Sequence, residues 1–241
     1  MMPLTENIHM TDVTAIIPAR GGSERVPRKN LQEIEGESLV SIAVRQARAT
    51  PSIDHVVVNS DDPTIRDVGE QSGAAVMGRP DEFTHDTTTQ EVDRLLQWSV
   101  EDLEAQGHEI SVLVLLYPTV PLRTVATIEE AVTLVADGVY DSVLSVHEDH
   151  SYLWEVTDGI ATPTNYDPRR RGPTQQEAWN QWVENLAVYA VDRDLFMQTG
   201  CRVCGTVGTV EMPRWRSVDI DTPVDLHLAR LLAADPPPSD P

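Results

Sequence analysis

Residues 13–30 read VTAIIPARGGSERVPRKN and join an apolar run to a basic loop. The first five residues are apolar or β-branched, which is typical of a buried strand, and Pro18 ends the run. The loop holds three arginines and Lys29, the only lysine of the chain. It has neither the G-x-G-x-x-G of a dinucleotide fold nor the G-K-[ST] of a P-loop. The segment therefore predicts a strand that presents cations and flexible backbone N–H groups to an anion such as a triphosphate.

Strands and helices alternate outward from this segment. Short β-branched or apolar runs predict strands at 55–58, 74–76, 112–116, 142–146 and 186–191. Apolar periodicity and capping residues predict helices from about Ser38, from 62–63, and over 88–106, 124–136 and 224–234. The run 112–116 is wholly apolar, as expected at the centre of a parallel sheet. The alternation predicts βαβ units and an α/β fold with a mostly parallel sheet.

Residues 151–183 break this rhythm, because they are polar and aromatic and contain the cluster Arg169-Arg170-Arg171. We interpret about 150–184 as an inserted lid or dimerisation arm within one domain over 12–235. Residues 1–11 and the proline-rich 236–241 are expected to be flexible tails.

Charge excludes one class of function. The 241 residues carry 39 Asp and Glu against 18 Lys and Arg, a net charge of −21, which argues against a protein that binds nucleic acid by neutralising phosphates. We expect a cytoplasmic protein without membrane contact, because neither a basic-apolar leader nor about 18 consecutive apolar residues is present. The acidic, lysine-poor composition favours adaptation to high salt, with drift in a GC-rich genome as the alternative. Cys201 and Cys204 have no further metal ligands nearby and are interpreted as incidental thiols.

A second group of chemistry-bearing residues lies at 217–226, SVDIDTPVDL. If this stretch is extended, Asp219 and Asp221 lie on one side, roughly 7 Å apart, and can hold Mg²⁺ together with substrate phosphates. The alternative is a helix N-terminus with Asp221 or Thr222 as the cap and Pro223 as the first helical residue. The metal site and the helix cap are compatible with each other. Because a cap does not explain Asp219, we favour a metal site.

Taken together, these segments resemble the acylneuraminate cytidylyltransferases, which comprise the CMP-sialic acid synthetases and their legionaminic and pseudaminic relatives. Residues 19–30 resemble the A-R-G-G-S-K-G-[IV]-P-x-K-N of that family, and 217–225 match S-I-D-I-D-T-P-x-D. Four segments between them resemble the family's S-T-D-D, R-P-x-E-L with a following D-T, L-L-Q-P-T-S-P-L-R and Y-x-E-N-G-A-I-Y, in the same order: 59–62, 79–87, 115–123 and 182–189. The resemblance covers about residues 12–232.

The resemblance implies a three-layer, Rossmann-like nucleotide-diphospho-sugar transferase fold, usually a homodimer whose arm reaches the partner's sugar site. It places in nucleotide binding Ala19, Arg20, Gly21, Gly22, Ser23, Lys29, Asn30, Arg79, Thr89 and Gln90. It places toward the sugar Tyr117, Arg123, Gln176, Glu184 and Asn185. It assigns Mg²⁺, or Mn²⁺, to Asp219 and Asp221, and catalysis to Arg20, Lys29 and Asp221.

The implied reaction is the Mg²⁺-dependent transfer of CMP from CTP to the anomeric hydroxyl of an acidic nine-carbon (nonulosonic) sugar, with release of pyrophosphate. Arg123 is expected to pair with the sugar carboxylate, or else to brace the turn at 118–121. Two alternative functions stay open, one of them enzymatic and the other of nucleotide binding alone. Residues 25–29 resemble the R-L-P-x-K of the 3-deoxy-manno-octulosonate cytidylyltransferases, and a non-catalytic nucleotide-binding regulator is the alternative from another class.

Four residues depart from the family pattern: Glu24, Tyr117, Val120 and Leu186 stand where the family has Lys, Gln, Ser and Gly. Glu24 would repel phosphate, a charge that Arg25 or Arg28 can offset. Tyr117 and Val120 predict a more apolar sugar pocket, and hence a preference for a deoxygenated acid, legionaminic or pseudaminic, over N-acetylneuraminic acid.

Overall fold

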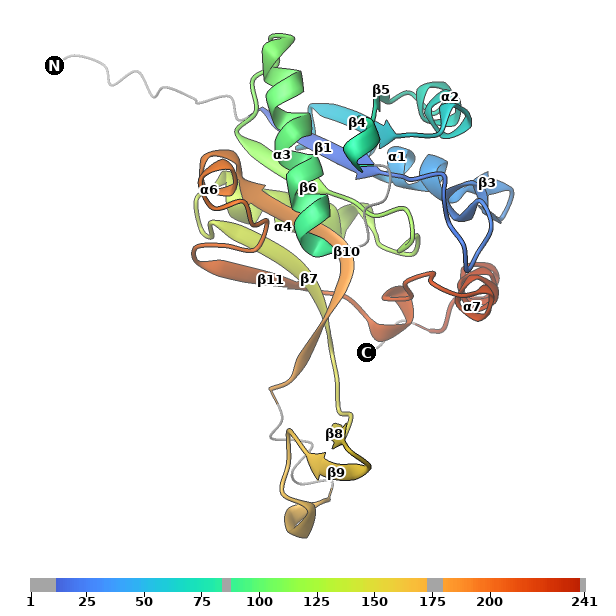
Figure 1. The fold of residues 1–241 in the computed structure, drawn as a ribbon, viewed down its shortest axis with the longest axis vertical. Helices are drawn as coiled ribbons and strands as arrows, with labels where there is room; N and C mark the ends of the chain where they lie inside the picture. The colour runs from blue at the N-terminus through green and yellow to red at the C-terminus, as the bar shows by residue number, and fades with distance from the viewer. Residues whose placement is uncertain (1–11, 84–87, 173–179, 239–241) are drawn as a thin grey trace, which may run out of the picture.

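A computed structural model describes residues 12–83, 88–172 and 180–238 of the chain. Within these residues, seven strands form one sheet in the order β11-β7-β10-β6-β1-β4-β5 (Figure 1). The strands are β1 (Val13–Pro18), β4 (His55–Ser60), β5 (Ala75–Gly78), β6 (Val112–Leu115), β7 (Ser142–Glu148), β10 (Trp182–Asp192) and β11 (Val207–Glu211). β1 pairs in parallel with β4 and β6, β4 with β5, and β7 with β11, whereas β10 is antiparallel to both β6 and β7. The predicted α/β class with a mostly parallel sheet is confirmed.

Helices cover both faces of the sheet and make three layers (Figure 1). One face packs against α1 (Leu39–Arg48), α2 (Pro63–Gln71) and α4 (Val125–Ala136), and the other against α3 (Thr89–Ala105) and α6 (Arg193–Thr199). Successive side chains of a strand point to opposite faces of the sheet, so each strand contributes to both cores. In β1, Ala15 and Ile17 lie in the first core, and Ile16 lies in the second.

The sequence did not predict β11 or α6. Along β11 only every second residue is buried, and Gly208 interrupts its pattern, which reads as a break in a strand. The structure gives the reason for this glycine, since a Cβ there would lie 2.3 Å from the ring of Tyr140.

A third, smaller apolar cluster docks the last helix, α7 (Pro223–Ala234), against the N-terminal part of the chain. Ile220, Leu226 and Ala229 pack there with Val26, Ile34, Leu39 and Ile42. Fully burying an aliphatic side chain stabilises a protein by about 1.5–3 kcal/mol, so this cluster is a firm attachment. It brings residues 219–221 beside the short helix η1 (Lys29–Leu31), nearly 200 residues away in the sequence.

Between β7 and β10 the chain leaves the body as an arm (Figure 1). It carries the hairpin β8 (Trp154–Thr157) and β9 (Ile160–Pro163), with Trp154, Val156 and Ile160 exposed. The arm lies within the predicted insertion at about 150–184, and its role in dimerisation stays a prediction, as does the division of the chain at 12–235. Residues 1–11 and 239–241 of the expected tails lie outside the described residues. In the described ranges we find no helix that is both long and apolar enough to cross a membrane.

Candidate active site

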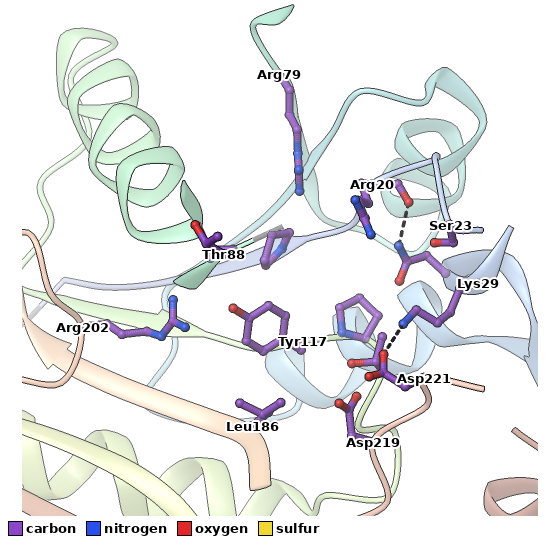
Figure 2. A pocket seen from close by; sticks show the side chains of 15 residues that line it. Arg20, Ser23, Lys29, Arg79, Thr88, Tyr117, Leu186, Arg202, Asp219 and Asp221 are labelled. Carbon is purple, nitrogen blue, oxygen red and sulfur yellow. Dashed lines mark hydrogen bonds and ion pairs between the residues drawn. The ribbon is translucent and has the colours of Figure 1, made fainter. Parts of the chain in front are cut away.

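A cleft of about 320 Å³ lies at the carboxyl ends of β1 and β6, where ligands of parallel α/β sheets gather (Figure 2). The basic loop lines one side of it with Arg20, Ser23, Lys29 and Asn30. Arg79, Thr88 and Val92 line a second side. Tyr117, Leu186 and Arg202 lie across from the loop, and Asp219 and Asp221 complete the wall beside Lys29 (Figure 2).

The basic loop is held in place by the turn after β4. The N–H of Gly21 donates to Oδ1 of Asp61 at 2.9 Å, and the Asn30 side-chain amide donates to the carbonyl of Arg20 at 2.9 Å. A Cβ at position 21 would lie 2.8 Å from the Cβ of Asp62, so the close approach of loop and turn requires glycine. Of the other predicted nucleotide ligands in the loop, Ala19 is buried beneath it and Gly22 is not part of the cleft lining.

The two carboxylates predicted to hold a metal do converge on the loop. Nζ of Lys29 lies 3.0 Å from Oδ1 of Asp221, and a guanidinium nitrogen of Arg25 lies 3.2 Å from its Oδ2. The helix-cap alternative is right for Thr222, which caps α7 with Pro223 in its first turn. Asp219 and Asp221 precede the cap and line the cleft.

Asp219 has an electrostatic reason to bind a cation. Its Oδ1 is buried without a hydrogen-bond partner, and burial raises the pKa of the carboxyl group. Among the described residues, no group of three or more His, Cys, Asp or Glu side chains is arranged to hold a metal by itself. Two carboxylates nevertheless fit Mg²⁺, which binds proteins through one or two carboxylates and takes its other ligands from phosphates and water.

Further polar atoms of the cleft are suited to a ligand. Oγ of Ser23 and Oδ1 of Asn30 are, like Oδ1 of Asp219, buried without a hydrogen-bond partner. Buried polar groups are nearly always paired in native proteins, so three unpaired ones lining one cleft indicate a polar ligand.

Arg79 is oriented by a buried network beneath it. Its Nε donates to Oδ1 of Asn59 at 2.8 Å, and the amide of Asn59 donates to Oγ of Ser99 at 3.0 Å. Of the two predicted neighbours, Gln90 is exposed and not part of the cleft lining, and the side chain of Thr89 lies outside the described part of the structure. Thr88 and Val92, just before and after them, line the cleft instead.

The assignment of Arg123 to the sugar carboxylate is wrong. Only 2% of Arg123 is exposed, and its Nη1 donates to the carbonyls of Tyr117, Val120 and Ala187 at 2.7, 3.0 and 3.2 Å. Burial lowers the pKa of Arg123 to about 9. The side chain therefore braces the turn after β6, which was the alternative.

Three other predictions on the sugar side change as well. Val120 is fully buried in the first core and cannot make the cleft apolar. Asn185 is also buried, and its amide donates to Oγ of Ser217 while its Oδ1 accepts from Oγ of Ser145. Glu184 accepts a hydrogen bond from the hydroxyl of Tyr189 and is not part of the cleft lining. Tyr117 does line the cleft, and Gln176 lies outside the described residues.

Arg202 is a charged residue of the cleft that the sequence did not predict. It forms an ion pair of 2.8 Å with Asp93 of α3, both side chains being 5% exposed, and its guanidinium lies 4.8 Å from the ring centre of Tyr189. The interpretation of the C-x-x-C motif considered Cys201 and Cys204 alone and assigned no role to Arg202 between them. A signal was present in α3, because a carboxylate on the buried face of a helix requires a nearby cation.

Glu24 does not face the cleft, since it is exposed and is not part of the cleft lining. Arg25, which was expected to offset it, contacts Asp221. The departure at position 24 thus lies outside the cleft.

A three-layer α/β sandwich, with a cationic loop after its first strand and an aspartate pair facing that loop, defines the class of nucleotidyl-transferring proteins. The profile of the family described as Cytidylyltransferase matches residues 14–158, and the chain belongs to this family. The chain is 31% identical over 221 residues to N-acylneuraminate cytidylyltransferase A of Danio rerio, covering 90% of this chain and 50% of the relative. It is 34% identical over 117 residues to the pseudaminic acid cytidylyltransferase of Campylobacter jejuni, covering 48% and 50%.

The chain thus spans about half the length of the first of these relatives, and its match to the second covers half of that protein. Among solved structures, a CMP:2-keto-3-deoxy-manno-octonic acid synthetase complexed with CTP is similar with a TM-score of 0.67 at 18% identity, over 93% of this chain and 99% of that one. At this identity the likeness concerns the fold alone, and it agrees with the predicted nucleotide-diphospho-sugar transferase fold.

Proposed function

We propose that this protein transfers CMP from CTP to the anomeric hydroxyl of a nonulosonic acid and releases pyrophosphate, with Mg²⁺ or Mn²⁺ as cofactor. The observation that carries the proposal is the meeting of the Arg20–Asn30 loop with Asp219 and Asp221 in one cleft. The names of the two relatives support a sialic-type acceptor.

In this proposal the loop binds the triphosphate. Arg20 and Lys29 neutralise its charge, the unpaired hydroxyl of Ser23 donates a hydrogen bond to a phosphate oxygen, and the unpaired Oδ1 of Asn30 accepts one from a nucleotide hydroxyl or from ordered water. Arg79, oriented by Asn59, is proposed to read the base. Catalysis of an in-line displacement at the α-phosphorus needs positioning and charge neutralisation more than a covalent step.

Lys29 would exchange partners when the nucleotide binds. Its Nζ now neutralises Asp221, and phosphate oxygens offer it a more highly charged partner at the same cleft wall. Asp219 and Asp221 would hold Mg²⁺, whose chemistry is to neutralise the charge that develops on the transferring phosphoryl group. Release of Asp221 from Lys29 thus couples nucleotide binding to the availability of the metal ligand.

The arm is proposed to contact a second copy of this chain. Its exposed Trp154, Val156 and Ile160 form apolar surface on a hairpin that projects into solvent (Figure 1). Such surface is typical of an interface. Sedimentation at several concentrations would show whether a dimer forms.

The test is pyrophosphate release from CTP with N-acetylneuraminic acid or 3-deoxy-manno-octulosonate as acceptor. We expect release with the nonulosonic acid and Mg²⁺, none with EDTA, and none from Asp221→Asn. Mg²⁺ should also raise the melting temperature of the wild type but not of Asp219→Asn, because this substitution removes one of the two negative charges that would hold the ion. CTP binding without pyrophosphate release from any acceptor would favour the regulator, and faster turnover of the octulosonate would favour the alternative enzyme.

A further inference from the structure

Leu186 holds a backbone conformation that a leucine avoids. Its φ is 61°, in the left-handed region where a Cβ crowds the following carbonyl oxygen and where glycine is the favoured residue. It lies where the pairing of β10 with β7 shifts register, between Glu184 and Tyr189. Residues in such conformations persist only where their surroundings fix them, and they cluster at functional sites.

Three buried side chains fix this bulge. Oγ of Ser145 accepts from the N–H of Val188 at 2.8 Å and donates to Oδ1 of Asn185 at 2.6 Å. Oδ1 of Asn185 also accepts from the N–H of Ala187 at 3.3 Å, and Arg123 donates to the carbonyl of Ala187 at 3.2 Å. Arg123 and Asn185, predicted as sugar ligands, thus act on the cleft through Leu186.

The bulge turns the side chain of Leu186 into the cleft. Leu186 lies below Tyr117 and faces the space between Arg202 and Asp219 (Figure 2). This is the side of the cleft away from the basic loop and Arg79, so it is the space left for the acceptor once the nucleotide is bound. A leucine there offers no hydrogen-bond partner to an acceptor hydroxyl.

We propose that Leu186 determines acceptor specificity by forming an apolar wall that selects a deoxygenated carbon over a hydroxyl-bearing one. This inference rests on the proposed function and gives its acceptor a chemical class: a nonulosonic acid that lacks one of the hydroxyl groups of N-acetylneuraminic acid at the carbon that meets Leu186. A hydroxyl placed against this wall loses its water without gaining a partner, which lowers kcat/KM by roughly 10- to 100-fold.

The experiment compares kcat/KM for N-acetylneuraminic acid and its 4-, 7-, 8- and 9-deoxy analogues at saturating CTP. We expect the wild type to prefer one of the deoxy acids over N-acetylneuraminic acid by at least about tenfold. Leu186→Asn should abolish or reverse this preference, because asparagine tolerates the left-handed conformation and offers a hydrogen-bond partner of similar size. Leu186→Gly should abolish it by removing the wall. The KM for CTP should change little in either variant.

Glu35→Gly is the matched control, because Glu35 also has a left-handed φ, of 51°, but is exposed and outside the cleft lining. It should relieve the same kind of backbone strain and leave the acceptor ratio unchanged. Wild-type turnover with no preference, or a preference that survives in both Leu186 variants, would overturn the inference alone. No pyrophosphate from any of these acceptors with the wild type would overturn the proposed function and the inference with it.

Discussion

Replacing Asp93 with asparagine should unfold the protein at a markedly lower temperature, because it leaves the guanidinium of Arg202 buried without a counter-charge. The pair is separated by 2.8 Å, and each side chain is 5% exposed. Removing one partner of a buried ion pair typically costs about 3–5 kcal/mol. For a chain of this length about 1 kcal/mol corresponds to roughly 2–4 °C, so the melting temperature should fall by about 6–20 °C.

Thermal unfolding followed by circular dichroism would measure this fall, with Glu37→Gln as the control. Glu37 and Arg45 form an ion pair of nearly the same length, 2.9 Å, but their side chains are 35% and 59% exposed. Exposed pairs contribute about 0–1 kcal/mol, so the control should melt within a few degrees of the wild type. Equal shifts in the two variants would refute the argument from burial.

A double variant separates the contribution of the intact ion pair to stability from the cost of leaving one partner buried alone. Burial raises the pKa of Asp93 even though Arg202 opposes the shift, so the charged pair is costly to bury as a whole. Changing Asp93 and Arg202 together to leucine should therefore recover most of the stability that Asp93→Asn loses. A double variant as unstable as the single one would show that the ion pair itself is a strong net contributor.

Two further predictions concern the loop and the surface. Lys29→Ala should lower turnover at least about 100-fold, the usual scale for one lost contact to transition-state charge, and near-wild-type turnover in a folded variant would exclude a role in binding phosphate. The net charge of −21 should make the protein less stable as salt is lowered, because unscreened carboxylates repel one another. Unfolding midpoints from low to molar KCl would measure this, and a flat profile would favour compositional drift.

The fold and the side of the cleft formed by the basic loop could be predicted from local sequence. The run at 13–17 and the run at 112–116 are strands because each is short, mostly apolar and buried on both faces. The loop that follows β1 must lie at the carboxyl edge of the sheet, so its cations gather there. Asp219 and Asp221 were predicted as metal ligands because a helix cap explains only one of two carboxylates so close to a helix start.

The acceptor half of the cleft could not be predicted in this way. Whether Arg123 or Arg202 reaches the cleft depends on which of them finds buried partners: carbonyls of the bulge and turn for Arg123, and Asp93, 109 residues away, for Arg202. A bulge also changes which side chains of a strand face the cleft, so the resemblance that placed Glu184 and Asn185 near the sugar does not give the direction of their side chains there. The sequence by itself therefore determined the layers and the basic loop, since both follow from short-range periodicity and composition. Only the tertiary structure decided that Leu186 and Arg202 face the cleft, because long-range hydrogen bonds and an ion pair set the direction of those side chains.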